Sequence, residues 1–125
     1  MTKKPTTAEL DVLTALWENG PSSVRDVHRV LSQSRDILYT TTLKTMQVMY
    51  GKGLLTRDDS SRAHIYEAAV AQSDIEKTML DGIADSLFSG STARLVISAL
   101  GHDKPTSDEL DAIRKLIDQL EEDND

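Results

Sequence analysis

The period of the hydrophobic pattern changes once along this chain, at the glycines of Gly51-Lys52-Gly53. Before these residues, apolar side chains recur every three or four positions, as they do on one face of a helix. Directly after them, two short β-prone runs flank a polar stretch. This order predicts a group of helices followed by a β-hairpin.

Three helices are predicted before the change. The first begins at Thr6, whose hydroxyl can cap it while Glu9 reaches back to the cap residue. The second begins after Ser23, and the third begins at Thr40 or Thr41. The polar connection between the last two is short, which is typical of a helix-turn-helix.

The segment after the third helix completes a recognisable fold. Residues 54–57 and 63–67 predict two strands around a polar loop, and such a hairpin directly after a recognition helix forms a wing. The fold class is therefore mainly α, with a winged helix-turn-helix that has a two- to three-stranded wing. We expect residues 1–72 to be this DNA-binding domain.

Residues 73–125 are predicted to be helical, with narrow apolar stripes. A segment of about fifty residues with stripes this thin buries too little surface to be stable alone. The simplest partner is a second copy of the same segment, because two-fold dimers are the commonest assembly. We therefore expect a helical dimerisation domain whose contacts are Ile75, Met79, Ile83, Leu87, Leu95, Leu110, Ile113, Ile117 and Leu120.

The formal net charge of −7 is unevenly distributed. Nine basic and eight acidic residues precede Ser73, whereas five basic and thirteen acidic residues follow from Ser73 onward. The acidity therefore belongs to the second half, and the first half can present a basic face to phosphate.

Composition also narrows the cellular context. The chain has no cysteine, which excludes disulfides and thiolate metal sites and fits a reducing cytoplasm. No apolar run approaches the roughly 20 residues of a membrane helix, and no apolar stretch follows the charges of the N-terminus. We expect a cytoplasmic protein without membrane insertion.

The start of the third helix carries the chemistry that DNA recognition needs. Recognition helices enter the major groove by their N-terminal end, where short hydroxyl, amide and cationic side chains can reach base edges. The candidate DNA-binding residues here are Thr41, Thr42, Lys44, Thr45 and Gln47. The alternative is that these threonines only cap and solvate an ordinary helix.

The wing offers two further candidates. Arg57 and Arg62 bracket the loop and could contact the phosphate backbone or the minor groove. The alternative is a solvated hairpin in which these arginines neutralise Asp58 and Asp59.

No constellation for catalysis or metal binding is visible. His28, His64 and His102 lie far apart in the sequence without other ligands at zinc-like spacing. The serines lack a Gly-x-Ser-x-Gly elbow, and there is no glycine-rich phosphate loop. We expect no enzymatic activity, no metal and no cofactor.

Several segments together resemble the penicillinase-repressor family of BlaI, MecI and CopY proteins. The resemblance covers nearly the whole chain and rests on Thr7–Leu13, Leu16-Trp17, Thr41–Thr45, Lys52–Leu55, Tyr66, Leu87-Phe88, Gly90-Ser91, Leu95-Val96 and Ser107–Leu110.

The resemblance implies a homodimeric repressor of an inverted-repeat operator, often of the TACA/TGTA type. The base-contacting positions of the family fall on Thr42, Lys44 and Thr45. Many members are cleaved by a sensor protease at an Asn-Phe pair, for which this chain has Ser98-Ala99. It also has Met49 where many members have an arginine, and it lacks the cysteines of the copper-responsive members.

The function expected from sequence is therefore that of a transcriptional repressor that binds operator DNA as a homodimer. The resemblance implies a sensor protease of unknown identity as a further partner, and Ser98-Ala99 in place of Asn-Phe puts cleavage of this chain in question. The alternative is a winged-helix adaptor that binds proteins instead of DNA, because the fold alone does not decide between them.

Overall fold

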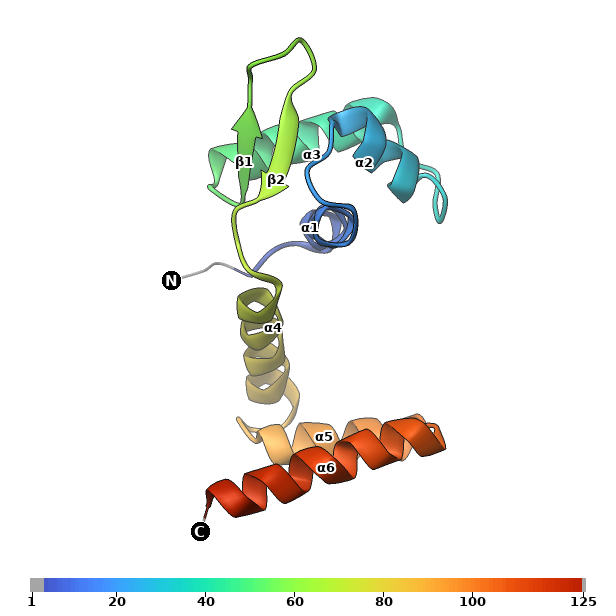
Figure 1. The fold of residues 1–125 in the computed structure, drawn as a ribbon, viewed down its shortest axis with the longest axis vertical. Helices are drawn as coiled ribbons and strands as arrows, with labels where there is room; N and C mark the ends of the chain where they lie inside the picture. Colours follow the sequence, from blue (N-terminus) through green and yellow to red (C-terminus); the bar gives the residue numbers. More distant parts are fainter. Residues whose placement is uncertain (1–3, 125) are drawn as a thin grey trace. The chain divides into compact units, whose positions relative to one another are not determined.

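The computed structural model describes residues 4–124 and divides the chain into two compact units, Met1–Met79 and Leu80–Asp125. Within the described residues it contains six helices and one two-stranded sheet (Figure 1). The elements are α1 (Thr7–Asn19), α2 (Val24–Leu31), α3 (Tyr39–Gly51), β1 (Leu55–Asp58), β2 (Ile65–Ala68), α4 (Gln72–Leu87), α5 (Thr92–His102) and α6 (Ser107–Asp123).

The first two helices begin where their capping residues predict. The Thr6 hydroxyl accepts a hydrogen bond from the Glu9 amide, and the Glu9 carboxylate accepts one from the Thr6 amide. Ser23 caps α2 by accepting from the amide of Asp26. α3 begins one residue before Thr40, after Leu38, whose side chain makes no capping hydrogen bond. The predicted start at Thr40 or Thr41 is therefore slightly too late.

The predicted wing is present. β1 and β2 pair antiparallel, with Arg57 opposite Tyr66 and Asp58 opposite Ile65. Ser22 and Tyr66 exchange two backbone hydrogen bonds, which adds one residue of a third strand beside β2. The wing is thereby attached to the turn before α2.

A single hydrophobic core holds the first unit together. α1 contacts α2, α3 and β2, and Trp17 Nε1 donates to the carbonyl of Val70 at 3.1 Å. The core consists of Val12, Leu13, Ala15, Leu16, Val24, Val27, Met46, Met49, Leu54, Leu55, Tyr66 and Ile75.

The beginning of α4 belongs to this core. Ile75 is 0% exposed, and Met79 packs against the same cluster. The prediction that Ile75 forms a dimer contact is therefore wrong, because its side chain is fully buried within its own unit, whereas Met79 is half-buried against the same cluster. The division between the units accordingly falls after Met79 rather than after Gln72.

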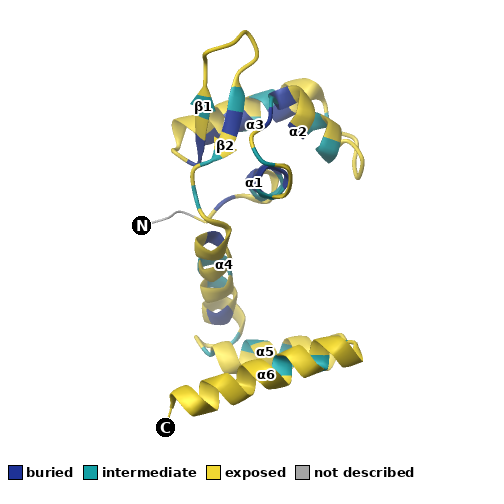
Figure 2. Cartoon of the chain, in the orientation of Figure 1, coloured by how far each residue is buried: buried dark blue, intermediate teal, exposed yellow. Residues whose placement is uncertain are grey.

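The second unit has almost no interior of its own. Among its described residues only Ala84 is buried, as the scarcity of dark blue in this unit shows (Figure 2). Large apolar side chains are instead exposed: Leu87 is 72% and Ile97 71% exposed. The thin stripes that the sequence indicates are real.

Candidate nucleic-acid interface

α3 buries one face and exposes the opposite one. Thr42, Met46 and Met49 point into the core, whereas Lys44 and Gln47 are exposed. The buried residues recur at i, i+4 and i+7, which leaves Lys44 near the middle of the outward face. The structure thus exposes two of the predicted site residues on the outward side of the predicted recognition helix.

Thr42 does not lie on that outward face. It is 2% exposed, and its Oγ1 lies 3.0 Å from Nδ1 of His28, with which it shares a hydrogen bond. Ser32 Oγ lies 3.2 Å from the other ring nitrogen of His28. The expectation that Thr42 is free to contact a base is wrong, because its hydroxyl joins α3 to α2.

Thr41 and Thr45 lie on the side of α3 that faces α1. With Thr6, Lys44 and Lys52 they line a groove of about 490 Å³. Thr41 is exposed, while Thr45 is half-buried and its hydroxyl donates to the Thr41 carbonyl at 2.9 Å.

The groove ends at an ion pair that joins α1 to the residue after α3. Lys52 Nζ donates to Glu9 Oε2 at 2.8 Å. Burial raises the pKa of the Glu9 carboxyl, but the hydrogen bonds from Lys52 and Thr6 outweigh burial and hold the pKa below its ordinary value. Lys52 is therefore a structural cation.

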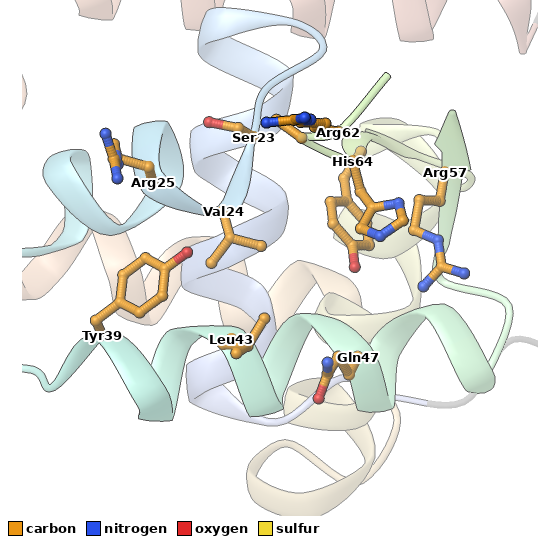
Figure 3. A pocket seen from close by; sticks show the side chains of 11 residues that line it. Ser23, Val24, Arg25, Tyr39, Leu43, Gln47, Arg57, Arg62 and His64 are labelled. Atoms are coloured by element: carbon orange, nitrogen blue, oxygen red, sulfur yellow. The ribbon is translucent and has the colours of Figure 1, made fainter. Parts of the chain in front are cut away.

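On its other side, α3 faces a hollow that the wing and α2 complete. This hollow has a volume of about 550 Å³ and is the pocket of Figure 3. Three arginines and a histidine contribute to its wall, and its lining residues are Ser23, Val24, Arg25, Tyr39, Leu43, Gln47, Arg57, Arg62, Ala63, His64 and Tyr66.

Sequence reasoning missed Arg25 as a site residue. It lies in the first turn of α2, and in Figure 3 it stands with Tyr39 at one end of the hollow, while Arg57 and His64 stand at the other. The N-terminus of α2 contributes Ser23 and Val24 to the same wall. Ser23 caps the Asp26 amide, and the partial positive charge of this helix end favours an anion there.

The two wing arginines have different surroundings. Arg57 Nε donates to Asp59 Oδ1 at 2.7 Å, and its guanidinium carbon lies 4.2 Å from the centre of the Tyr50 ring. The Tyr66 hydroxyl and then Asp59 raise the pKa of Arg57. Arg62 is exposed and makes no ion pair with any residue in the described part of the chain. Arg62 is therefore the more available cation of the two.

Residues 5–119 match the sequence model of the family described as penicillinase repressor. The chain belongs to this family. It is accordingly a DNA-binding transcriptional repressor by class, rather than an enzyme or a protein-binding adaptor.

Curated relatives cover most of the chain. It is 31% identical over 115 residues to the transcriptional regulator BlaI of Mycobacterium tuberculosis, an alignment that spans 90% of this chain and 82% of that protein. It is 20% identical over 112 residues to the methicillin resistance regulatory protein MecI of Staphylococcus aureus, with 90% and 91% of the two chains covered.

Solved structures agree with the fold. The Bacillus licheniformis BlaI monomeric form in complex with the blaP half-operator is 25% identical, with a TM-score of 0.51, over 59% of this chain and 93% of that one. A MarR family protein from Bacillus stearothermophilus has a TM-score of 0.53 over 97% of this chain and 76% of that one, at 15% identity, and shows likeness of fold alone.

The described residues offer neither a membrane-spanning helix nor a metal site. No helix between residues 4 and 124 combines the length and the apolarity that crossing a membrane requires. Within the same range, no three His, Asp or Glu side chains are grouped so that they could hold a metal ion.

Proposed function

We propose that this repressor binds an inverted-repeat operator as a homodimer and reads its sequence with α3 in the major groove. The observation that carries the proposal is that Gln47 and three arginines line one hollow beside α3, while Lys44 is exposed on the outward side of the same helix. These residues concentrate positive charge around α3 in a chain whose net charge is −7.

The outward face of α3 supplies the base contacts. Lys44 can donate to the O6 and N7 acceptors of guanine, and Gln47 can pair with adenine. Thr41 can contact a thymine methyl from the edge of the helix. Thr45 is a weaker candidate, because it is half-buried and its hydroxyl is already bonded within α3.

The hollow supplies the phosphate contacts. Arg62 on the wing and Arg25 on α2 both line the hollow beside α3, so they can hold the phosphate backbone that borders the major groove. The N-terminus of α2 favours a phosphate between them. These contacts supply affinity for any sequence, while Lys44 and Gln47 supply the selection.

The exposed apolar side chains of the second unit support the homodimer. A second copy would cover Ile83, Leu87, Leu95, Leu110, Ile113, Ile117 and Leu120, which the structure leaves exposed or half-buried. The related BlaI structure contains a monomeric form on a half-operator. A dimer with one copy on each half of an inverted-repeat operator would account for the exposed apolar side chains and would match the half-operator of the related BlaI structure.

Control by a sensor protease stays a prediction. Ser98 and Ala99, the residues implied as the cleavage position, lie inside α5. Proteases prefer exposed loop tips to helices. Cleavage there would require α5 to unwind locally.

The proposed function is tested by a gel shift with DNA from immediately upstream of the gene that encodes this chain. The full-length protein should shift that duplex well below the concentration that shifts a scrambled duplex, and the gap should persist at a higher salt concentration. Light scattering of the same sample should give twice the mass of the chain. Equal affinity for both duplexes would contradict sequence-specific repression, and a monomeric mass would contradict the dimer.

A further inference from the structure

Asp59 is the centre of the charge network on the wing. Its Oδ1 accepts from Arg57 Nε at 2.7 Å, and its Oδ2 accepts from Arg57 Nη2 at 3.3 Å. His64 Nδ1 lies 2.5 Å from the same Oδ1. One carboxylate therefore engages two of the residues that line the hollow of Figure 3, although Asp59 is not part of the lining.

Arg57 does not depend on Asp59 for its orientation. Its guanidinium is stacked on the Tyr50 ring of α3, and its backbone is fixed in the β1–β2 ladder opposite Tyr66. Stacking on an aromatic face holds a planar guanidinium in place by itself. Asp59 places a negative charge against the guanidinium N–H donors of Arg57, which would otherwise be able to bind a phosphate.

Asp59 thus occupies Arg57 much as a phosphate would. Both are anions with two oxygens for a bidentate contact with guanidinium. The hydrogen bond from Arg57, with that from His64, keeps the pKa of the Asp59 carboxyl below its ordinary value, so the carboxylate stays charged.

We propose that Asp59 is an intramolecular competitor of DNA phosphate for Arg57 and so limits the affinity of the wing for the DNA backbone. This inference rests on the proposed function and deepens it. Phosphate contacts are the same for every DNA sequence, so Asp59 lowers the sequence-independent part of the binding affinity. The pair is exposed, and exposed pairs are weak, so Asp59 reduces the contact without abolishing it.

The neighbouring Asp58 provides a matched control. Its carboxylate accepts from the Ser60 amide at 2.9 Å, and an asparagine there keeps this hydrogen bond through its amide oxygen. Asp58→Asn and Asp59→Asn thus change the net charge equally, but only the second frees Arg57.

The experiment measures fluorescence anisotropy of labelled operator and scrambled duplexes with the full-length protein over a series of salt concentrations. Asp59→Asn should tighten binding to both duplexes by the same factor, roughly three- to tenfold at low salt. Its plot of log K against log salt should become steeper by about one. Asp58→Asn should produce a clearly smaller gain with little change of slope.

A double-mutant cycle identifies Arg57 as the group released. Arg57→Ala should weaken binding less in the wild-type protein than in Asp59→Asn, where it should remove most of the gain. The inference is overturned if Asp59→Asn weakens binding, matches Asp58→Asn, or keeps its gain without Arg57. If the wild-type protein and both asparagine variants bind no duplex, the proposed function fails, and this inference fails with it.

Discussion

Lys44 and Arg62 each carry an exposed positive charge, but the proposed interface gives them different tasks. Lys44→Ala should weaken operator binding by roughly 1–3 kcal/mol and reduce discrimination among bases at the position it reads. Arg62→Ala should weaken all duplexes alike and flatten the salt dependence by about one unit of slope. Anisotropy titrations with operator and scrambled duplexes measure both effects.

The contrast between these two variants can fail in either direction. If Lys44→Ala loses as much affinity for scrambled DNA as for operator, then Lys44 contacts only phosphate. If the salt slope of Arg62→Ala equals that of the wild-type protein, then Arg62 lies outside the interface.

Thr42 should matter for stability rather than for base preference. Thr42→Val preserves the shape of the side chain but leaves Nδ1 of His28 without its hydrogen-bond partner. The free energy of unfolding should fall by about 1–3 kcal/mol, and base preference should not change. Thr41→Val, at an exposed position, should change the free energy of unfolding by no more than about 0.5 kcal/mol.

Denaturant unfolding and operator-variant titrations of the same two proteins test the role of Thr42. A Thr42→Val protein of native stability with altered base preference would place this side chain on the DNA.

The sequence located the recognition helix but misassigned a face within it. A signal was present, because Thr42, Met46 and Met49 repeat at the spacing of a buried helical stripe. Thr42 was nevertheless assigned to DNA because a threonine hydroxyl can also contact a base, and this reading ignored the spacing that indicates burial. Leu43, the residue after Thr42, is half-buried and lines the hollow.

At the scale of elements, what was predictable depended on local chemistry. Thr6 and Ser23 mark helix starts with their own hydrogen bonds, so α1 and α2 could be read from single residues. Leu38, the residue before α3, has no side chain that can cap a helix, so the predicted start of α3 is too late. Arg25 was missed because its proximity to the wing depends on how α2, α3 and the hairpin pack.

The ion pair between Glu9 and Lys52 should make stability depend on acid. The folded pKa of Glu9 is below its ordinary value of 4.5, so this carboxyl stabilises the native state above that pH. Its contribution is lost as the pH falls through the folded pKa. The free energy of unfolding should therefore decline below about pH 4.5, and it should decline less in Glu9→Gln.

Urea unfolding at a series of pH values measures this dependence. Lys52→Met provides the companion variant, because it removes the hydrogen bond and the charge by which Lys52 lowers the pKa of Glu9, so the decline in acid should be smaller than in the wild-type protein. Identical acid profiles for Glu9→Gln and the wild-type protein would show that Glu9 has the same pKa in both states.

At the scale of the whole molecule, one apolar stripe serves two purposes. Ile75, Met79, Ile83 and Leu87 are spaced by four along α4, and nothing in the sequence separates the first pair from the second. In the structure, the first pair is packed in the core of the DNA-binding unit, and the second pair is exposed. The sequence could predict the stripe, but the partner of each turn depends on the three-dimensional fold.

The position of a truncation within α4 should therefore decide whether the first unit stays folded. A chain that ends at Met79 keeps Ile75 and its neighbours, and it should be a folded monomer that binds operator more weakly than the full-length dimer. A chain that ends at Gln72 loses these buried side chains and should be less stable by about 2–5 kcal/mol.

Denaturant unfolding and light scattering of the two truncated chains and the full-length protein measure these differences. A dimer formed by the chain that ends at Met79 would place the contact between subunits in the winged helix rather than in the second unit. Equal stability of the two truncated chains would mean that Ile75 adds nothing to the core that surrounds it. The expected pattern instead makes the first turns of α4 part of the DNA-binding unit, so that only the helix beyond Met79 is available to join two copies.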